Sequence, residues 1–340
     1  MPIEPGRAPL RVFLTVDTEI WPRAAGWPHT PLPLGETCER ERAAYFWGGE
    51  GRDRRGLPYQ LETLARHGLK ATYFVDALFS RCLGAPLLGE VVGAIAGAGQ
   101  EIGLHLHPEW LTDPRCRDLP EFAGPLLHQY DAEAQGQLVR AGLGILSDAG
   151  ASAICAFRAG TWGANLVTLR ALAAAGIRFD SSLNAYTAAS FPDLTDRSAW
   201  LQPRSLEGVW EFPVTFFVDR PPKGTRPLHV TACTFAELAL ALEHAQAQGW
   251  FSVVIVFHCF EFVRVAELGR PGGRVGPQRL LARLFERLCR YLSRHRDRFQ
   301  TSSFAELGSV PATPMGQSPA RSNRVRTLTR QASQLLSRVL

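Results

Sequence analysis

The side chains best suited to catalysis lie where short apolar stretches of the sequence end. Asp17 and Glu19 follow the first stretch, and His105 and His107 end the third. Because the members of each pair are two positions apart, they face the same side of an extended chain. Carboxylates and imidazoles gathered in this way can bind a divalent metal, and three protein ligands with one open position are usual at a catalytic zinc site.

Polar residues also end three later stretches: Arg158 follows the fourth, Asp180 the fifth and His258 the seventh. Each residue has an ordinary explanation when it is taken alone. A His-x-His pair is more often part of the core or the surface, an Asp at a strand end commonly caps a helix, and a buried Arg usually balances a carboxylate. The presence of such residues at all five ends favours a functional site.

The elements that must position these residues follow a regular alternation. Predicted strands lie at residues 11–16, 70–76, 101–106, 153–157, 177–179, 209–217, 251–257 and 299–304. Predicted helices lie at residues 57–67, 87–98, 132–148, 166–175, 235–248 and 277–295. This alternation indicates parallel β/α units, and seven or eight of them predict an α/β fold with a distorted (β/α) barrel. In such barrels the working residues lie at the C-terminal ends of the strands.

The composition is that of a globular protein with a sizeable core, with 46% of the 340 residues hydrophobic and 20% charged. Length does not decide the number of domains, because α/β barrels run to roughly 200–250 residues as one domain. The net charge is +5, and the chain after Glu306 has no acidic residue but has five arginines: Arg321, Arg324, Arg326, Arg330 and Arg338. The remainder is close to neutral, which argues against a nucleic-acid partner.

Cysteine usage and the apolar runs bear on the compartment. The seven cysteines form no CxxC pair, which argues against a disulfide framework and against a thiolate zinc site. The first residues lack the basic and apolar regions of a secretory signal, and the longest apolar runs are too short to span a bilayer. We therefore expect a cytoplasmic protein.

Six stretches, taken in order, resemble the motifs of the polysaccharide deacetylases with a NodB-homology domain (carbohydrate esterase family four). They are Thr15-Val16-Asp17-Thr18-Glu19; Lys70-Ala71-Thr72-Tyr73-Phe74-Val75; Glu101-Ile102-Gly103-Leu104-His105; Phe157-Arg158-Ala159-Gly160; the middle strands Phe179-Asp180-Ser181-Ser182 and Trp210-Glu211-Phe212-Pro213; and Val254-Ile255-Val256-Phe257-His258. The resemblance runs from about residue 10 to residue 307. It implies a metal-dependent amide hydrolase that removes an N-acyl group, first of all N-acetyl, from an amino sugar or a surface-polysaccharide precursor.

The resemblance also implies roles for individual residues. Asp17 is expected to act as the base for the attacking water, and His258 as the acid for the leaving nitrogen. Arg158 is expected to hold Asp17 ionised and oriented, and Asp180 to position the polar groups around it. The expected metal ligands are Glu19, His105 and His107. Imidazole and carboxylate ligands suit Zn²⁺, with Co²⁺, Ni²⁺ or Mn²⁺ as alternatives.

Two motifs depart from the family's pattern. The family's first motif has two adjacent aspartates, whereas Thr18 fills the second place here and Glu19 is the next carboxylate. The family's second motif spaces its histidines four apart, whereas Glu109 occupies the later place here. We expect Glu19 and His107 to serve as ligands from shifted positions. The alternative is that Asp17 is itself a ligand and that Glu109 contributes.

Two segments do not follow the β/α alternation. Residues 21–56 have no clear period, and their aromatic residues (Trp21, Trp27, Tyr45, Phe46 and Trp47) suit either a sugar-facing wall or lid, or plain packing. Residues 308–323 read as a linker, and residues 325–340 as a basic amphipathic segment. This segment could touch a membrane surface or a partner, but we expect a solvated tail. The chain therefore divides into a barrel domain, 1–307, and a basic Ser/Pro/Arg-rich linker and tail, 308–340.

Two further functions stay open at this point. The motif departures and the aromatic residues between 21 and 47 also suit a catalytically inactive barrel that binds carbohydrate. A third reading keeps the hydrolase but gives it an amide that is not a sugar. Metal content, together with acetate release from an N-acetylglucosamine substrate, separates the three.

Overall fold

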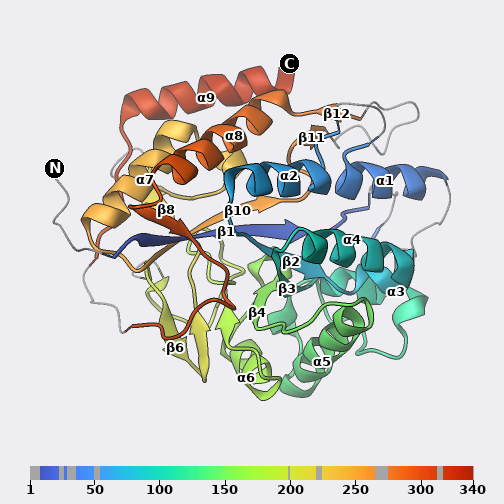
Figure 1. Ribbon diagram of the computed structural model, residues 1–340. Helices are drawn as coiled ribbons and strands as arrows, with labels where there is room; N and C mark the ends of the chain where they lie inside the picture. The colour runs from blue at the N-terminus through green and yellow to red at the C-terminus, as the bar shows by residue number, and fades with distance from the viewer. Residues whose placement is uncertain are drawn as a thin grey trace.

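The predicted strands assemble side by side into one curled sheet (Figure 1). In this computed structural model the sheet has nine strands in the order β10-β1-β2-β3-β4-β5-β7-β6, with β13 beside β1. The strands are β1 (Leu10–Thr18), β2 (Thr72–Asp76), β3 (Glu101–Leu106), β4 (Ala156–Ala159), β5 (Phe179–Asp180), β6 (Arg204–Leu206), β7 (Val209–Glu211), β10 (Ser252–His258) and β13 (Phe299–Thr301). Every neighbouring pair is parallel except β6 and β7.

The structure describes residues 8–22, 27–28, 36–49, 54–197, 200–219, 224–264, 275–311 and 317–339, and the side chains at 36–39 and 336–339 lie outside that description. Within these residues the two ends of the sheet come together near β10. The N–H of Thr215 donates to the Val254 oxygen (3.4 Å), and the N–H of Val254 donates to the Thr215 hydroxyl (2.9 Å). The expected distorted (β/α) barrel is thereby confirmed.

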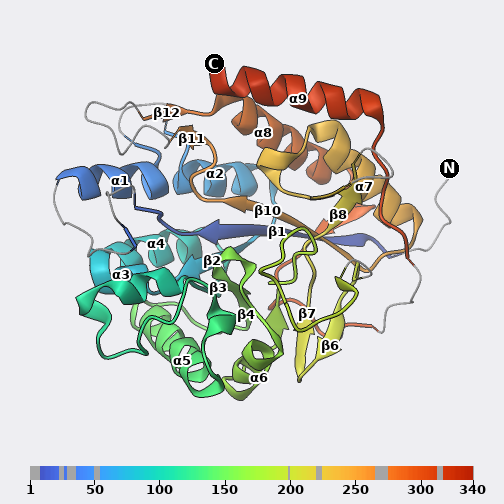
Figure 2. The ribbon, with the colours of Figure 1, turned by 180° about the vertical axis from the view of Figure 1, so that it is seen from behind.

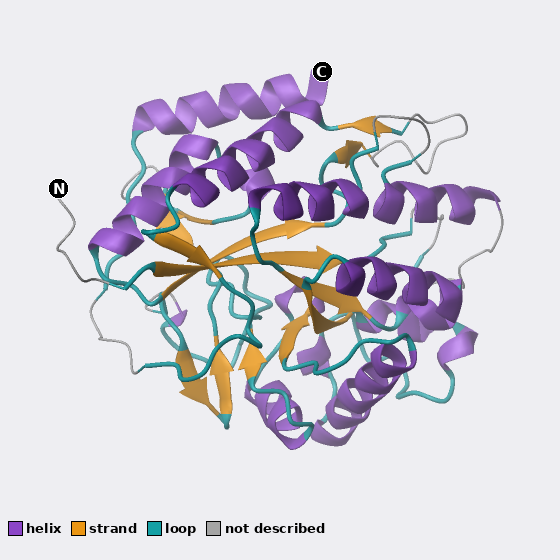
Figure 3. Cartoon of the chain, viewed as in Figure 1, coloured by secondary structure: helices purple, strands orange, loops and turns teal. Residues whose placement is uncertain are grey.

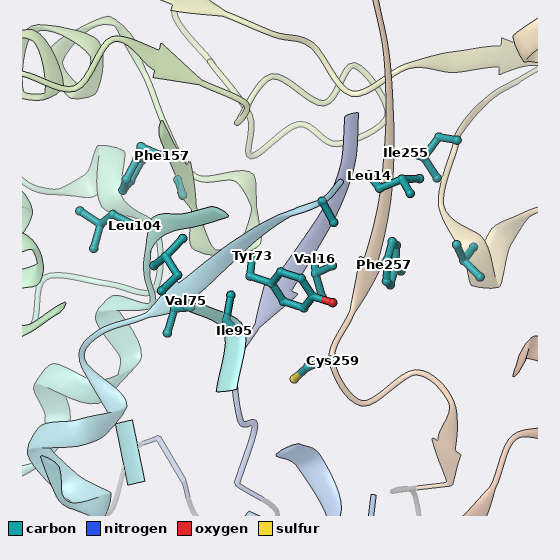
Figure 4. Packing of buried hydrophobic residues seen from close by; sticks show 14 of the residues in the cluster. Leu14, Val16, Tyr73, Val75, Ile95, Leu104, Phe157, Ile255, Phe257 and Cys259 are labelled. Atoms are coloured by element: carbon teal, nitrogen blue, oxygen red, sulfur yellow. The ribbon is translucent and has the colours of Figure 1, made fainter. Parts of the chain in front are cut away.

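Side chains along each strand alternate between the barrel interior and the surrounding helices. On β1, Leu14 and Val16 pack outward into the main hydrophobic core, whereas Phe13 belongs to a separate inner cluster and Asp17 lies in the polar site above it. The neighbouring strands follow the same parity, so the outward set from five strands meets in one layer: Leu14, Val16, Tyr73, Val75, Leu104, Phe157, Ile255 and Phe257 (Figure 4). A period of two is what a half-buried strand imposes, and it sends the polar strand-end residues inward.

Helices cover the outside of the curled sheet, as the two opposite views show (Figures 1 and 2). They are α1 (Glu36–Trp47), α2 (Leu57–His67), α3 (Phe79–Leu83), α4 (Ala85–Gly97), α5 (Ala132–Asp148), α6 (Leu166–Ala174), α7 (Phe235–Ala247), α8 (Arg279–Arg294) and α9 (Arg324–Val339). Local signals fix several ends: Asp131 caps α5, Asn165 caps α6, and Gly68 ends α2 with a φ of 57°. Among the described residues no helix is long and apolar enough to cross a bilayer.

The sequence predicted several elements to the residue, but one predicted strand is wrong. The expected helices at 57–67 and 132–148 and the expected strand at 101–106 are confirmed as α2, α5 and β3. The single strand expected at 209–217 is wrong: β7 ends at Glu211, and β8 (Phe216–Val218) pairs with β9 (Thr225–Pro227) in a separate ribbon (Figure 3). Pro213 lies between the two strands and cannot donate to a sheet ladder, so the strand breaks there.

The aperiodic segment at 21–56 is partly helical, which corrects the expectation of an irregular loop. Helix α1 turns Tyr45 and Phe46 into the core, where they contact Phe260 and Phe79. Trp21 lies instead against the ring of His107. Plain packing therefore accounts for Tyr45 and Phe46, whereas Trp21 faces the candidate site. Residues 23–26, 29–35 and 50–53 of this segment lie outside the described residues.

The basic C-terminal segment is not the solvated tail that we expected. Its residues 324–339 form α9, and a backbone ladder ties the approach to it, because Val218 N–H donates to Ala320 O and Ser322 N–H donates to Val218 O, both at 2.8 Å. The buried guanidinium of Arg330 pairs with Asp219 at 2.5 Å and also with Glu237. These contacts hold α9 on the body. The division into domains at residue 307 stays a prediction.

We expect Arg330→Gln to loosen α9, because the change removes one partner of a buried ion pair, a loss that typically costs about 3–5 kcal/mol. Urea denaturation should show a lower free energy of unfolding, and trypsin should cleave faster at Arg321. The control is Arg324→Gln, which changes an exposed arginine of the same helix. Equal stability and equal trypsin resistance in Arg330→Gln and Arg324→Gln would show that the Arg330 ion pairs do not hold α9 on the body.

Candidate active site

Three ligand atoms from two strands of the sheet converge at its C-terminal edge. Glu19 lies one residue past the end of β1, His105 lies in β3, and His107 follows that strand. The Glu19 Oε2 atom is 3.0 Å from His105 Nε2 and 2.7 Å from His107 Nε2. All three residues are buried, and their ligand atoms lie within 4.8 Å of one another. The structure thus brings together the three residues expected to hold a metal.

The far nitrogen of each imidazole is fixed by a second contact. His105 Nδ1 lies 2.7 Å from the Arg158 carbonyl oxygen, and His107 Nδ1 lies 3.1 Å from Glu109 Oε2. Since a carbonyl or a carboxylate can only accept, each Nδ1 donates, and in the neutral ring the Nε2 lone pair then faces Glu19. In that state three acceptors point at one place, and a divalent cation there would satisfy all of them. The donor set fits a divalent metal, and Nδ1 contacts of this kind are typical of metal-binding histidines.

Protons on the imidazoles can balance the charge of Glu19 in the same way. Burial would raise the pKa of Glu19, but His107 and the hydrogen bonds from both imidazoles hold that pKa well below its usual value. Burial would lower the pKa of His107, but Glu19 and Glu109 raise it well above its usual value. The three side chains are therefore arranged around positive charge, whether protons or a metal ion supply it.

The buried guanidinium of Arg158 holds Asp17 beside this cluster. Arg158 Nη1 donates to Asp17 Oδ1 at 2.7 Å, and Nη2 donates to the hydroxyls of Thr15 (2.9 Å) and Ser181 (3.0 Å). Its Nε donates to the Ser181 carbonyl oxygen at 2.9 Å. The other oxygen of Asp17 faces His258, whose Nε2 atom is 4.0 Å away. Arg158 thus orients Asp17 through its Oδ1 atom, and the Oδ2 atom lies on the side of His258.

His258 approaches the cluster from the end of β10. Its Nε2 atom is 3.7 Å from Glu19 Oε1, and its Nδ1 atom is 2.7 Å from Glu261 Oε1. The same Glu261 oxygen is 3.2 Å from His229 Nε2. Burial lowers the pKa of His258, but the hydrogen bond with Glu261 and the nearby carboxylates outweigh it and raise the pKa to about 9. His258 therefore carries a proton at neutral pH.

Aromatic side chains form the wall of a small cavity at the cluster. The cavity measures about 190 Å³ and is lined by Asp17, Glu19, Trp21, His105, His107, Ala159, Thr161, Trp162 and His258. Thr161 and Trp162 adopt φ values of 51° and 63° in the turn after β4. Gly160 opens this turn, and a Cβ atom there would lie 2.7 Å from His107 Nδ1. Only glycine therefore lets the turn pack against the imidazole.

Asp180, expected to position polar groups around Asp17, lies outside the lining of this cavity. Its Oδ1 atom accepts from Ser182 Oγ at 2.6 Å, and Ser182 in turn accepts from the N–H of Ala159. Asp180 is the register partner of Glu211 on β7, and the buried Asp180 Oδ2 and Glu211 Oε2 atoms have no other hydrogen-bond partner among the described residues. Burial, and then the neighbouring carboxylate of Asp180, raises the pKa of Glu211 well above its usual value. The two buried carboxyls therefore share a proton, and any role of Asp180 acts through Ser182 and β4.

Three residues of this region were missed by the sequence reasoning. Glu261 ends the turn after β10, and its position near His258 was a usable signal. Asp76 ends β2, as the predicted residues end theirs; it accepts from Trp110 Nε1 at 2.8 Å, and burial raises its pKa to about 6. His229 had no signal, because it belongs to an irregular segment that meets β10 through one isolated bridge. Glu109 contacts His107 rather than the shared ligand position.

Comparison with known proteins gives structural likenesses alone. No protein-family model matches the sequence, and no curated protein matches it. A structure assigned as a polysaccharide deacetylase from Mycobacterium smegmatis is 19% identical, with a TM-score of 0.46 over 92% of this chain and 98% of its own. A family 4 carbohydrate esterase from Streptomyces lividans, in complex with acetate, is 11% identical, with a TM-score of 0.40 over 88% and 93% of the two chains. A peptidoglycan deacetylase from Bacillus subtilis is 12% identical, with a TM-score of 0.35 over 99% of each.

We expect Glu211→Gln to flatten the pH dependence of stability. The folded chain keeps the shared proton at pH values where the unfolded chain has released it, so the free energy of unfolding falls as the pH rises from the ordinary glutamate range towards the raised pKa. The fall approaches about 1.4 kcal/mol per pH unit for one proton. In the variant the introduced amide donates an N–H to Asp180 and needs no proton.

Urea denaturation over a pH series measures this difference between the two proteins. Glu133→Gln, on the exposed face of α5, is the matched control and should follow the wild type. Parallel curves for the wild type and Glu211→Gln would show that the carboxyls do not share a proton.

Proposed function

We propose that this protein is a metal-dependent hydrolase that removes an N-acyl group, N-acetyl first of all, from an amino sugar or a surface-polysaccharide precursor. The observation that carries the proposal is the convergence of Glu19, His105 and His107 as three acceptors on one place, with Asp17 and His258 beside them. A cation site flanked by a carboxylate and an imidazole is the arrangement that hydrolysis of an unactivated amide needs.

The metal ligands in this proposal are Glu19, His105 and His107. A bound Zn²⁺, or Co²⁺, Ni²⁺ or Mn²⁺ in its place, supplies Lewis-acid polarisation of the acyl carbonyl and a lowered pKa for water. Glu109 and the Arg158 carbonyl hold the two imidazoles in the tautomer that leaves Nε2 free to bind. The alternative in which Asp17 is a ligand is less well supported, because Asp17 is not among the residues whose ligand atoms converge within 4.8 Å, and Arg158 already holds its Oδ1 atom.

Asp17 acts as the base in this proposal. Its Oδ1 atom is fixed by Arg158, the residue lines the cavity, and its Oδ2 atom takes a proton from the attacking water. General-base assistance of this kind contributes roughly 10²–10⁴ in rate. Arg158 and Ser181 are positioning residues: Arg158 acts through Asp17 and through His105, and Ser181 acts through Arg158.

His258 acts as the acid. Amide nitrogen leaves poorly unless it is protonated, and the Nε2 atom of His258 lies across the cavity edge from Asp17. Glu261 holds the opposite nitrogen at 2.7 Å, which aims Nε2 into the cavity and stabilises the protonated ring. His229 contacts the same Glu261 oxygen and so limits its movement.

The substrate class follows from the wall and from the size of the cavity. At about 190 Å³ the cavity is smaller than those that enclose a whole drug-sized ligand, so it suits one group that projects from a larger molecule. Trp21 and Trp162 line it, and such rings offer flat apolar faces to a sugar. The six motifs that resemble those of polysaccharide deacetylases support an N-acylated sugar over another amide.

Purified protein should release acetate from N-acetylglucosamine or its short oligomers, and the release should depend on a divalent ion. Dialysis against a chelator should abolish it, and added Zn²⁺ or Co²⁺ should restore it. Elemental analysis and an enzymatic acetate assay measure the two quantities. Metal bound without hydrolysis of any amide would favour an inactive barrel that binds carbohydrate, and hydrolysis of non-sugar amides alone would favour the third reading.

His105→Ala and His258→Ala should fail in different ways. Removing His105 deletes a ligand, so bound metal and acetate release should be lost together. Removing His258 deletes the acid alone, so the rate should fall by roughly 10²–10⁴ with the metal retained. Metal content by mass spectrometry and initial rates distinguish the two variants.

Circular dichroism should show both variants folded, and His67→Ala, at the outer end of α2, is the matched control that keeps metal and rate. Near-normal metal content in His105→Ala would refute the ligand assignment. An unchanged rate in His258→Ala would remove that residue as the acid.

A further inference from the structure

Helix α9 has its amphipathic faces reversed. A surface helix normally buries its apolar face, but here Val325, Leu328 and Leu335 are 71%, 65% and 64% exposed. On the opposite face Thr327 and Arg330 are each only 2% exposed. Among the described residues only one other large hydrophobic side chain, that of Tyr186, is comparably exposed. A helix that turns its apolar side to solvent presents a surface that suits contact with a partner or a membrane.

Polar contacts with the body fix this orientation. Arg330 Nη2 donates to Asp219 at 2.5 Å, Arg330 also pairs with Glu237, and the Thr327 hydroxyl donates to the other Asp219 oxygen at 2.7 Å. Rotating α9 to bury its leucines would break all three contacts and would leave two buried carboxylates without their partner on this helix. The apolar face therefore stays outward as long as α9 is docked.

Exposed basic residues lie at the start of α9 and on its neighbour α8. No acidic residue follows Glu306 in the sequence, and Arg321 and Arg324 are exposed at the start of α9. Helix α8 runs alongside α9 in both opposite views (Figures 1 and 2), and the two helices line a common crevice. Five exposed arginines follow one another along α8: Arg279, Arg283, Arg287, Arg290 and Arg294.

We propose that α9 docks on the surface of a bilayer that contains anionic phospholipids. Val325 and Leu335 are ten residues apart, which is about 15 Å along a helix, so the apolar face can lie flat in the interface. Exposed arginines at its side would meet lipid phosphates, and each basic residue near an anionic surface adds to binding. Apolar insertion combined with basic charge is the pattern of interfacial helices.

A second copy of the chain fits this face less well than lipid does. A symmetric contact would place the same patch on both subunits, and here it would bring two arginine-rich helices together with no acidic residue on either α9. Nucleic acid offers phosphates but nothing for an exposed stripe of Val and Leu. Only an anionic membrane surface matches both the apolar and the charged part of the face. This inference concerns binding and is independent of the proposed hydrolase activity.

The test is co-sedimentation of the full chain with vesicles. We expect binding to phosphatidylcholine vesicles that contain phosphatidylglycerol, little binding to phosphatidylcholine alone, and release by salt. The double variant Leu328→Ser with Leu335→Ser should bind at least roughly tenfold more weakly. Arg321→Gln with Arg324→Gln should weaken binding to the anionic vesicles in the same direction.

Matched controls and light scattering make each outcome decisive. Tyr186→Ser removes an exposed apolar side chain elsewhere, and Arg170→Gln removes an exposed arginine on α6, so both should bind as the wild type does. All the substitutions are at exposed positions, and thermal unfolding verifies the fold. Failure of the wild type to bind anionic vesicles, or equal binding by the leucine double variant, would overturn the proposal. A wild-type dimer that the leucine variant converts to a monomer would also overturn it, because a second copy would then occupy the face.

Discussion

The whole site depends on one guanidinium that has no contact with water. Arg158 is fully buried, and a buried charge is tolerated only when it is paired and hydrogen-bonded. Its nitrogens donate to Asp17, Thr15 and Ser181, while its own carbonyl oxygen holds His105 Nδ1. One residue of β4 therefore positions both the proposed base and one of the proposed metal ligands. Its guanidinium also lies 4.4 Å above the ring of Phe74, which closes the site from below.

The barrel interior consequently has two layers of opposite character. The lower layer is aromatic, with Phe13, Phe74, Phe179, Phe212 and Phe304 packed in one cluster. The upper layer holds the carboxylates and imidazoles. The alternation of side chains along a strand links the two layers, because Phe13, Thr15 and Asp17 are successive inward positions of β1. An apolar floor keeps the local dielectric low, so each charge–charge contact above it is stronger than it would be in water, and an unpaired group there would cost more.

The sequence predicted those parts of the site that strand geometry alone determines. Asp17 and Glu19, like His105 and His107, share a face because extended chain has a period of two, and parallel strands bring their ends together. Glu261 is only three residues from His258, so its contact is local. His229 depends on tertiary approach, because it reaches the site from an irregular turn that no periodicity marks. The orientation of α9 was unpredictable for a related reason. Its pattern of Val and Leu suggests a buried apolar face, and only the position of Asp219 and Glu237 on other elements reverses it.

The two histidines proposed as ligands are held by groups outside the proposed ligand set. The Arg158 carbonyl oxygen belongs to β4, and Glu109 belongs to the turn after β3. The Nδ1 atom of each imidazole is therefore held by a residue of a different element. Gly160 adds a steric limit, because the turn that contains it packs directly on His107. The ring orientations are thus set by the fold before any ion arrives, and little conformational entropy is lost when Nε2 takes a ligand. That preorganisation explains why the shifted positions of Glu19 and His107 can still form one site: the surrounding contacts, rather than the spacing of the motif, place the donor atoms.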